Sequence, residues 1–234
     1  MRDLFCFLLV LHYLCIPTTN NIIMDENTHN APTPCSPLDQ CVTSWPRLSS
    51  GVAYNYLVDY HTYNTYGAYS LAPEEWDNRE MIYNFKNNPE LTDPVSHRNA
   101  MEKAIALLLP QLRATFGEHL PRLTLVCIPA STAEKTKARF EEFASVVTDA
   151  TGMANGYPHV QVAVDAESKH LSNLPEYTLD EEWFAGRNVL LFDDIMATGG
   201  SINSFAQQMT SGGAHVVAAL VLGKTVVDKF GKEQ

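Results

Sequence analysis

The sequence is poor in positive charge. Among its 234 residues, 16 are lysine or arginine and 27 are aspartate or glutamate, which gives a formal net charge of −11. Proteins that bind nucleic acid broadly need a basic field along the phosphates, so we expect no stable complex with nucleic acid. A single phosphate ligand is compatible with an acidic chain, because a few local donors are enough to bind it.

Cysteine pairs with metal-ligand spacing are also missing. The five cysteines are irregularly spaced and none forms a C-x-x-C pair, so the sequence favours neither a zinc site nor a disulfide framework. Cys127 lies in an apolar run, where a free cysteine packs as a small apolar residue.

The sequence has no apolar run of membrane-spanning length. MRDLFCFLLVLHYLC (1–15) holds about a dozen apolar residues, whereas a membrane helix needs roughly 20. The segment resembles the apolar region of a signal peptide but lacks a small-x-small cleavage site after it. Two interpretations stay open. Either residues 1–23 are a mis-assigned extension before Met24 and the protein is cytoplasmic, or they export the chain.

Residues 24–50 are rich in Pro, Thr, Ser and Asn, a composition that predicts a flexible arm. We expect one domain over 51–234. At its start, residues 52–70 alternate aromatic and polar side chains, which is typical of strands or of a hairpin lid. Their tyrosines form either an aromatic face packed on the domain or a stacking surface.

Predicted helices and strands alternate along the rest of the domain. Apolar spacing predicts helices over 74–88, from Asp93 to about Phe116 with a kink or an end at Pro110, from a capping box at Ser131–Glu134 to near Gly152, and over 201–211. Short apolar runs predict strands at 122–131, 159–164, 188–194 and 215–222, and the polar stretch 165–186 predicts a long loop. This order is typical of an α/β fold with a mostly parallel sheet and helices on both faces.

Ligands of such folds bind at the carboxyl ends of the strands, and the stretch NVLLFDDIMATGGSIN (188–203) lies there. Thr-Gly-Gly-Ser (198–201) joins a strand to a helix start, where free N–H groups bind anions and glycines allow close approach. Asp193 and Asp194 would repel that anion but accept hydrogen bonds from vicinal hydroxyls. Either half alone also occurs in metal sites, receiver-like sheets or plain turns. Together they predict a site for a sugar with a phosphate and a diol, such as ribose 5-phosphate.

The segment VLLFDDIMATGGS (189–201) resembles the ribose-phosphate-binding motif of type I phosphoribosyltransferases, with its apolar run, acidic pair, and small-Thr-Gly-x-hydroxyl loop. The similarity extends to the competence protein F-like (ComF-like) branch over residues 76–225, through IYNFK (82–86) and CIPASTAEKTKARFEEF (127–143). Two features depart from that branch. Its four-cysteine module is reduced to Cys35 and Cys41, and its R-G-F-N-Q-like segment reads A-R-F-E-E (138–142).

The resemblance implies an N-terminal hood over the sheet and an enzyme, a pentosyltransferase that uses 5-phosphoribosyl 1-pyrophosphate (PRPP) and Mg²⁺. It would transfer ribose 5-phosphate to a base or amine and release pyrophosphate. The resemblance implies catalytic roles at the ribose hydroxyls, and at Mg²⁺ through substrate and water, for Asp193 and Asp194. It places the 5-phosphate on a loop of five residues, Ala197, Thr198, Gly199, Gly200 and Ser201. It places pyrophosphate on a second loop, at Ala130, Ser131, Thr132 and Lys135.

Several alternatives stay open. Lys169 and His170 lie where the family has a mobile loop, and they either reach pyrophosphate or are ordinary exposed residues. Lys137 and Arg139 either bind phosphate or solvate a helix face. The rival function is a catalytically weak PRPP- or nucleotide-binding protein with a regulatory or DNA-uptake accessory role. A phosphatase or receiver-like protein is disfavoured by the Thr-Gly-Gly-Ser loop. The family resemblance is compatible with a homodimer, and the acceptor is not specified.

Overall fold

The computed structural model describes residues 36–62, 71–88, 91–164 and 176–226. The chain divides into two units, Met1–Pro34 and Cys35–Gln234, and all described residues belong to the second. The expected extension (1–23) and the first part of the expected arm therefore lie outside the described residues.

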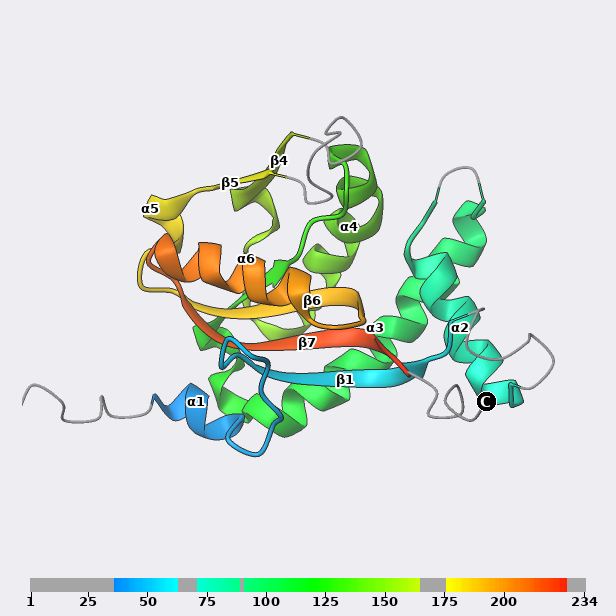
Figure 1. Ribbon diagram of the computed structural model, residues 1–234, viewed down its shortest axis with the longest axis horizontal. Helices are drawn as coiled ribbons and strands as arrows, with labels where there is room; N and C mark the ends of the chain where they lie inside the picture. Colours follow the sequence, from blue (N-terminus) through cyan, green and yellow to red (C-terminus); the bar gives the residue numbers. More distant parts are fainter. Residues whose placement is uncertain (1–35, 63–70, 89–90, 165–175, 227–234) are drawn as a thin grey trace, which may run out of the picture. The chain divides into compact units, whose positions relative to one another are not determined.

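A five-stranded parallel sheet forms the centre of the second unit (Figure 1). Every neighbouring pair in it runs parallel, which confirms the predicted α/β class with a mostly parallel sheet. In spatial order the strands are β1 (Ala53–Tyr60), β7 (His215–Thr225), β6 (Asn188–Met196), β2 (Leu123–Cys127) and β3 (Ala154–Asn155). All five side chains of β2 are buried, as expected of a parallel strand covered on both faces.

Helices cover both faces of the sheet (Figure 1). On one face lie α2 (Pro73–Phe85), α3 (Pro94–Phe116) and α4 (Ala133–Thr151), and on the other lies α6 (Gly200–Ser211). Strand β6 shows the cause, because successive side chains point to opposite faces. Leu190 and Phe192 join the core beneath α2, α3 and α4, whereas Val189 and Leu191 join the core beneath α6. The helical segments are α1 (Pro37–Cys41), α2 (Pro73–Phe85), α3 (Pro94–Phe116), η1 (Gly117–Arg122), α4 (Ala133–Thr151), η2 (Tyr157–His159), α5 (Glu181–Phe184) and α6 (Gly200–Ser211).

The strand predicted at 159–164 forms, as β4 (Val160–Val164), but it does not join the central sheet. It pairs antiparallel with β5 (Glu176–Leu179) in a separate two-stranded ribbon. The place beside β2 is taken by β3, where the N–H of Gly156 donates to the Leu125 carbonyl at 2.9 Å. The predicted loop 165–186 therefore contains β5 and α5, and its residues 165–175 lie outside the described part of the chain.

Helix α3 runs through Pro110 instead of ending there. Asp93 caps its first turn as predicted, accepting hydrogen bonds from two backbone N–H groups. Pro110 is on the exposed side, while Leu108, Leu112 and Phe116 are buried against the sheet on either side of it. The helix continues because this apolar contact offsets the hydrogen bond that proline removes. No helix among the described residues is long and apolar enough to cross a lipid bilayer.

The tyrosine-rich stretch supplies the edge strand β1, which pairs in parallel with β7. This part of the stretch is thus a sheet strand and not a hairpin lid. Lys224 lies 5.3 Å from the ring centroids of both Tyr54 and Tyr56, and its amine donates to the Tyr54 hydroxyl at 3.2 Å. Tyr54 packs against the core on the α6 side, whereas Tyr56 is exposed beside Lys224. Residues 63–70 lie outside the described residues.

The segment 36–50, expected to be the end of a flexible arm, is folded against the sheet. Helix α1 starts with a capping box at Ser36, and the side chains of Leu38 and Val42 are completely buried in the core that α3 covers. Leu48 packs against the other core, beside α6. A few well-placed apolar residues therefore order a segment whose average composition indicates disorder.

Replacing Leu38 by alanine should lower the free energy of unfolding by about 2–5 kcal/mol, because it leaves a cavity in a fully buried site. Ser44→Ala, at an exposed position of the same segment, is the control and should change stability little. Urea denaturation of both variants measures the difference. A Leu38→Ala variant as stable as the unmodified protein would show that the segment is not part of the core.

Candidate functional site

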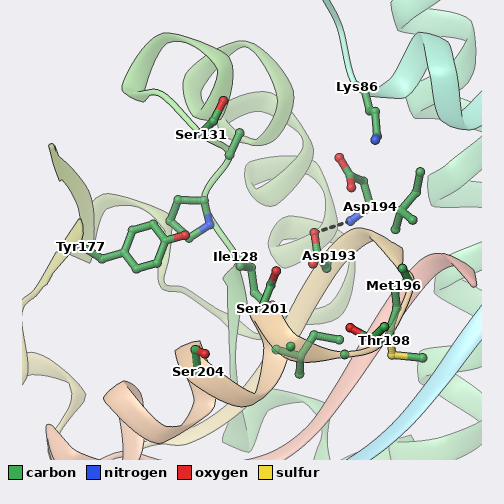
Figure 2. A pocket seen from close by; sticks show the side chains of 17 residues that line it. Lys86, Ile128, Ser131, Tyr177, Asp193, Asp194, Met196, Thr198, Ser201 and Ser204 are labelled. Atoms are coloured by element: carbon green, nitrogen blue, oxygen red, sulfur yellow. Dashed lines mark hydrogen bonds between the residues drawn. The ribbon is translucent and has the colours of Figure 1, made fainter. Parts of the chain in front are cut away.

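A cavity of about 580 Å³ opens at the carboxyl ends of β2 and β6 (Figure 2). Its lining comes from the end of β6 and the loop after it, the first turns of α6, and the loop that follows β2. Lys86 at the end of α2 and Tyr177 on β5 complete it. The structure therefore brings together the two loops that the sequence singles out, 129–135 and 193–201.

The predicted site residues fall into three groups. The acidic pair and the five-residue phosphate loop all line the cavity, at Asp193, Asp194, Ala197, Thr198, Gly199, Gly200 and Ser201. Ala130 and Ser131 of the predicted pyrophosphate loop line it too, whereas Thr132 and Lys135 do not. Lys169 and His170 lie outside the described residues.

Thr132 has a structural task instead, because it is the N-cap of α4. Its hydroxyl accepts a hydrogen bond from the Lys135 N–H at 3.1 Å, so the capping residue is Thr132 and not Ser131 as predicted. A second threonine steadies the loop, since the Thr136 hydroxyl accepts from the Ala130 N–H at 2.9 Å and donates to the Thr132 carbonyl at 2.8 Å. These bonds hold the loop backbone against the cavity.

The phosphate loop ends at the N-terminus of α6. The N–H of Asn203 donates to the Gly199 carbonyl at 2.9 Å, so the N–H groups of residues 200–202 have no acceptor within the helix. Such groups, together with the helix dipole, form an anion site. Thr198 and Ser201 add hydroxyls to the same rim of the cavity.

Gly199 is required by backbone conformation and by a neighbour. Its φ is +82°, a left-handed conformation that favours glycine. A Cβ at this position would lie 2.6 Å from a terminal methyl of Leu48, so a side chain would meet the folded arm before it met a ligand. Gly200 is different, since a Cβ there meets nothing nearer than the Thr198 hydroxyl, at 3.7 Å.

The acidic pair lies within β6, whose pairing with β7 continues to Met196. Alternation along the strand directs the two side chains to opposite faces. Asp194 forms an ion pair with Arg139 of α4, and the two side chains are only 8% and 14% exposed. Asp193 is on the α6 side, and its carboxylate accepts a hydrogen bond from the Asp194 N–H at 2.8 Å (Figure 2). The two aspartates are therefore not equivalent.

Burial, followed by the negative charge of Asp194, raises the pKa of Asp193 well above its usual range. The hydrogen bond from the Asp194 N–H and the positive charges of Arg139 and Lys86 oppose this rise. Across the cavity, burial and the charge of Asp193 raise the pKa of Tyr177 to about 12, so its phenol stays a hydrogen-bond donor at neutral pH. Burial likewise raises the pKa of the Cys127 thiol. The side chain is 5% exposed, which confirms the prediction that it is a core residue.

Three residues of this site, namely Arg139, Lys86 and Tyr177, were not assigned to it from the sequence. Arg139 was considered only as a phosphate ligand or as part of a solvated helix face. Arg139 does not lie on a solvated helix face, because its side chain is nearly buried. Its guanidinium forms an ion pair with Asp194 and is therefore not free to bind phosphate. Its neighbour Lys137 is 69% exposed and lies 4.0 Å from Glu141, as expected on a solvated face. Lys86 and Tyr177 line the cavity although neither belongs to a local pattern that marks a site.

The described residues contain no group of three or more His, Cys, Asp or Glu side chains that could hold a metal ion. The carboxylates of Asp193 and Asp194 are the anionic oxygen ligands that line the cavity. Mg²⁺ takes about six oxygens and retains several waters. A Mg²⁺ ion at this site would need substrate oxygens and water to complete its coordination.

A scan of the chain against models of known protein families finds no match, and a search of curated proteins finds no significant match. Any function assigned to this chain therefore depends on its motif and on the geometry of the cavity.

Replacing Asp193 by asparagine should stabilise the protein at neutral pH. Because the folded-state pKa is raised, ionising Asp193 costs the folded state free energy. That cost is absent below the unfolded pKa of about 3.9 and grows as the pH rises through the folded pKa. Thermal melts should therefore show a higher Tm for Asp193→Asn near pH 7 and a smaller gain near pH 4.

Asp194→Asn is the matched comparison, since it removes the partner of the nearly buried Arg139 and should lower the Tm near pH 7. If Asp193→Asn raises the Tm by the same amount near pH 4 and near pH 7, the raised pKa of Asp193 is contradicted.

Proposed function

We propose that the protein is a type I phosphoribosyltransferase that binds PRPP with Mg²⁺ and transfers its ribose 5-phosphate to a nitrogenous acceptor. The observation that carries the proposal is the arrangement of one cavity. In it, the β6 acidic pair and the N-terminus of α6 with its Thr-Gly-Gly-Ser loop line the same cavity. A parallel sheet with this loop between β6 and α6 supports the family resemblance of the motif.

The 5-phosphate would bind the N–H groups of residues 200–202 and the hydroxyls of Thr198 and Ser201. The ribose would lie over the β6 end, where Asp193 is free to accept hydrogen bonds from its hydroxyls. The loop at Ala130 and Ser131 faces the same cavity from the end of β2 (Figure 2). Its backbone is held by the Thr136 hydroxyl and would receive the pyrophosphate end of the substrate.

In the reaction, the bond from the anomeric carbon to pyrophosphate breaks and pyrophosphate leaves with the electron pair. The acceptor nitrogen forms the new bond and loses a proton. The transition state carries positive charge on the ribose, and fixed negative charge nearby stabilises it. Asp193 supplies that charge when ionised. When bound, Mg²⁺ would neutralise charge on the leaving pyrophosphate, and Asp193 and Asp194 would contact it through substrate oxygens and water.

A second candidate function is a PRPP- or nucleotide-binding protein with weak catalysis, in a regulatory or DNA-uptake accessory role. One observation favours it. Asp194 is engaged by Arg139, which stands in the A-R-F-E-E segment (138–142) that departs from the family pattern. Release of pyrophosphate from PRPP and Mg²⁺, with a panel of bases and amines as acceptors, tests the two candidates. Catalysed release with one acceptor supports the transferase, and tight PRPP binding without release supports the binding protein.

Asp193→Asn should weaken the binding of Mg²⁺ and PRPP about ten- to a hundredfold, because a charged hydrogen-bond partner contributes about 1.5–3 kcal/mol. Calorimetric titration of the variant and the unmodified protein measures the change. The thermal melts described above serve as the control for folding. Unchanged affinity in a folded variant would remove the ribose role from Asp193.

Gly199→Val should abolish binding of ribose 5-phosphate, because a β-branched residue cannot hold the left-handed loop conformation without strain and would clash with Leu48. Thr198→Val keeps the backbone and should cost only about 0.5–1.5 kcal/mol of binding free energy. Equilibrium titration with ribose 5-phosphate measures both variants.

The control for backbone strain is Gly186→Val, since Gly186 has φ +74° and open space around its Cβ position. That variant should lose stability but retain ribose 5-phosphate binding. Normal binding by Gly199→Val would show that the phosphate lies elsewhere.

A further inference from the structure

Lys86 is the one basic side chain among the described residues that line the cavity. Figure 2 shows its amine directed toward the acidic pair from the side opposite the phosphate loop. Its positive charge favours the ionised form of Asp193. The other cation nearby, Arg139, is committed to Asp194. Within the described lining of the cavity, Lys86 is thus the cation that an anionic ligand would meet.

The backbone on both sides of Lys86 is fastened to neighbouring elements. The carbonyl of Lys86 accepts a hydrogen bond from Nε of Arg139 at 3.1 Å. The side chain of the next residue, Asn87, donates to the Ala138 carbonyl at 3.0 Å, and Asn87 has a φ of +48°, rare for a residue with a side chain. Such a conformation persists only where surrounding contacts hold it.

The residue before Lys86 is anchored equally firmly. Phe85 is completely buried, and its ring centroid lies 5.2 Å from that of Phe143 and 6.2 Å from those of Phe140 and Phe192. The half-buried Lys86 therefore extends into the cavity from a backbone that neighbouring contacts hold in place. A surface lysine that only solvates a helix end needs none of these attachments.

The position of Lys86 relative to the two faces of β6 indicates which anionic group it would contact. Asp194, Arg139 and the α2 end lie on the face covered by α2 and α4, whereas the N-terminus of α6 lies on the other. The 5-phosphate and the diphosphate of one substrate repel each other and need separate sites. The loop before α6, residues 197–201, has no basic residue, so it would bind a monophosphate through its N–H groups. A diphosphate carries more negative charge and gains more from a cation.

We propose that Lys86 binds the diphosphate of the substrate and of the product, on the opposite side of the acidic pair from the 5-phosphate loop. This inference rests on the proposed function and gives Lys86 the task that the sequence assigned to Lys135, which does not line the cavity. The contact is a charge-assisted hydrogen bond from the ammonium group to diphosphate oxygens.

Separate titrations of the full-length protein with pyrophosphate, ribose 5-phosphate and PRPP, each with Mg²⁺, test the proposal. Lys86→Gln and Lys86→Met should each weaken pyrophosphate and PRPP binding about ten- to a hundredfold, and should leave ribose 5-phosphate binding nearly unchanged. Lys86→Met retains the apolar stem of the side chain, so it guards against a packing defect in Lys86→Gln. Lys137→Gln makes the same change in net charge on an exposed face of α4 and should change no affinity.

The outcomes separate this inference from the proposed function. An unmodified protein that binds neither PRPP nor ribose 5-phosphate overturns the proposed function and the role of Lys86 with it. An unmodified protein that binds both, with folded Lys86 variants that bind pyrophosphate normally, overturns only the role of Lys86. Equal losses for pyrophosphate and ribose 5-phosphate also overturn it, because Lys86 would then act on the whole cavity and not on the diphosphate.

Discussion

The ion pair between Arg139 and Asp194 links three elements next to the cavity, α4, β6 and the end of α2. Arg139 belongs to α4, Asp194 to β6, and the same guanidinium bonds the backbone of Lys86 at the end of α2. Removing one partner of a nearly buried pair costs about 3–5 kcal/mol, because the other charge is left without compensation. Arg139 holds both the Asp194 side chain and the backbone of Lys86. Loss of either charge of the pair would therefore change the positions of both residues.

This pair also explains why two adjacent aspartates differ in chemistry. Asp194 has its charge balanced within the protein, whereas Asp193 faces a cavity with its pKa raised by burial and by its neighbour. When the pKa of a carboxyl group is raised in this way, a cation or hydroxyl donors brought by a ligand stabilise its ionised form. Because side chains alternate along β6, the charge that Arg139 balances lies on one face of the strand and the Asp193 carboxyl lies on the other.

Local patterns predicted much of this arrangement, and contacts between distant segments account for the rest. Asp193 and Gly199 belong to one contiguous segment, which forms β6, the glycine loop and α6. Their spacing in the sequence was therefore enough to predict that both line one cavity. Strand β4 was misplaced because an apolar run looks the same in a central sheet as in a separate ribbon. Leu38 was missed because average composition hides single buried residues. Lys86 and Arg139 meet only in the folded chain.

Leu48 lies so close to Gly199 that the segment 36–50 packs directly on the loop before α6. The side chains of Ser49 and Ser50 strengthen this packing through hydrogen bonds with Asn203, one turn into α6. A ligand that fixes the loop also keeps the turn around Leu48 docked. Because such coupling is reciprocal, any event that detaches the turn lowers the affinity for that ligand by the same factor. Docking of this turn and occupancy of the loop by a ligand would therefore be coupled.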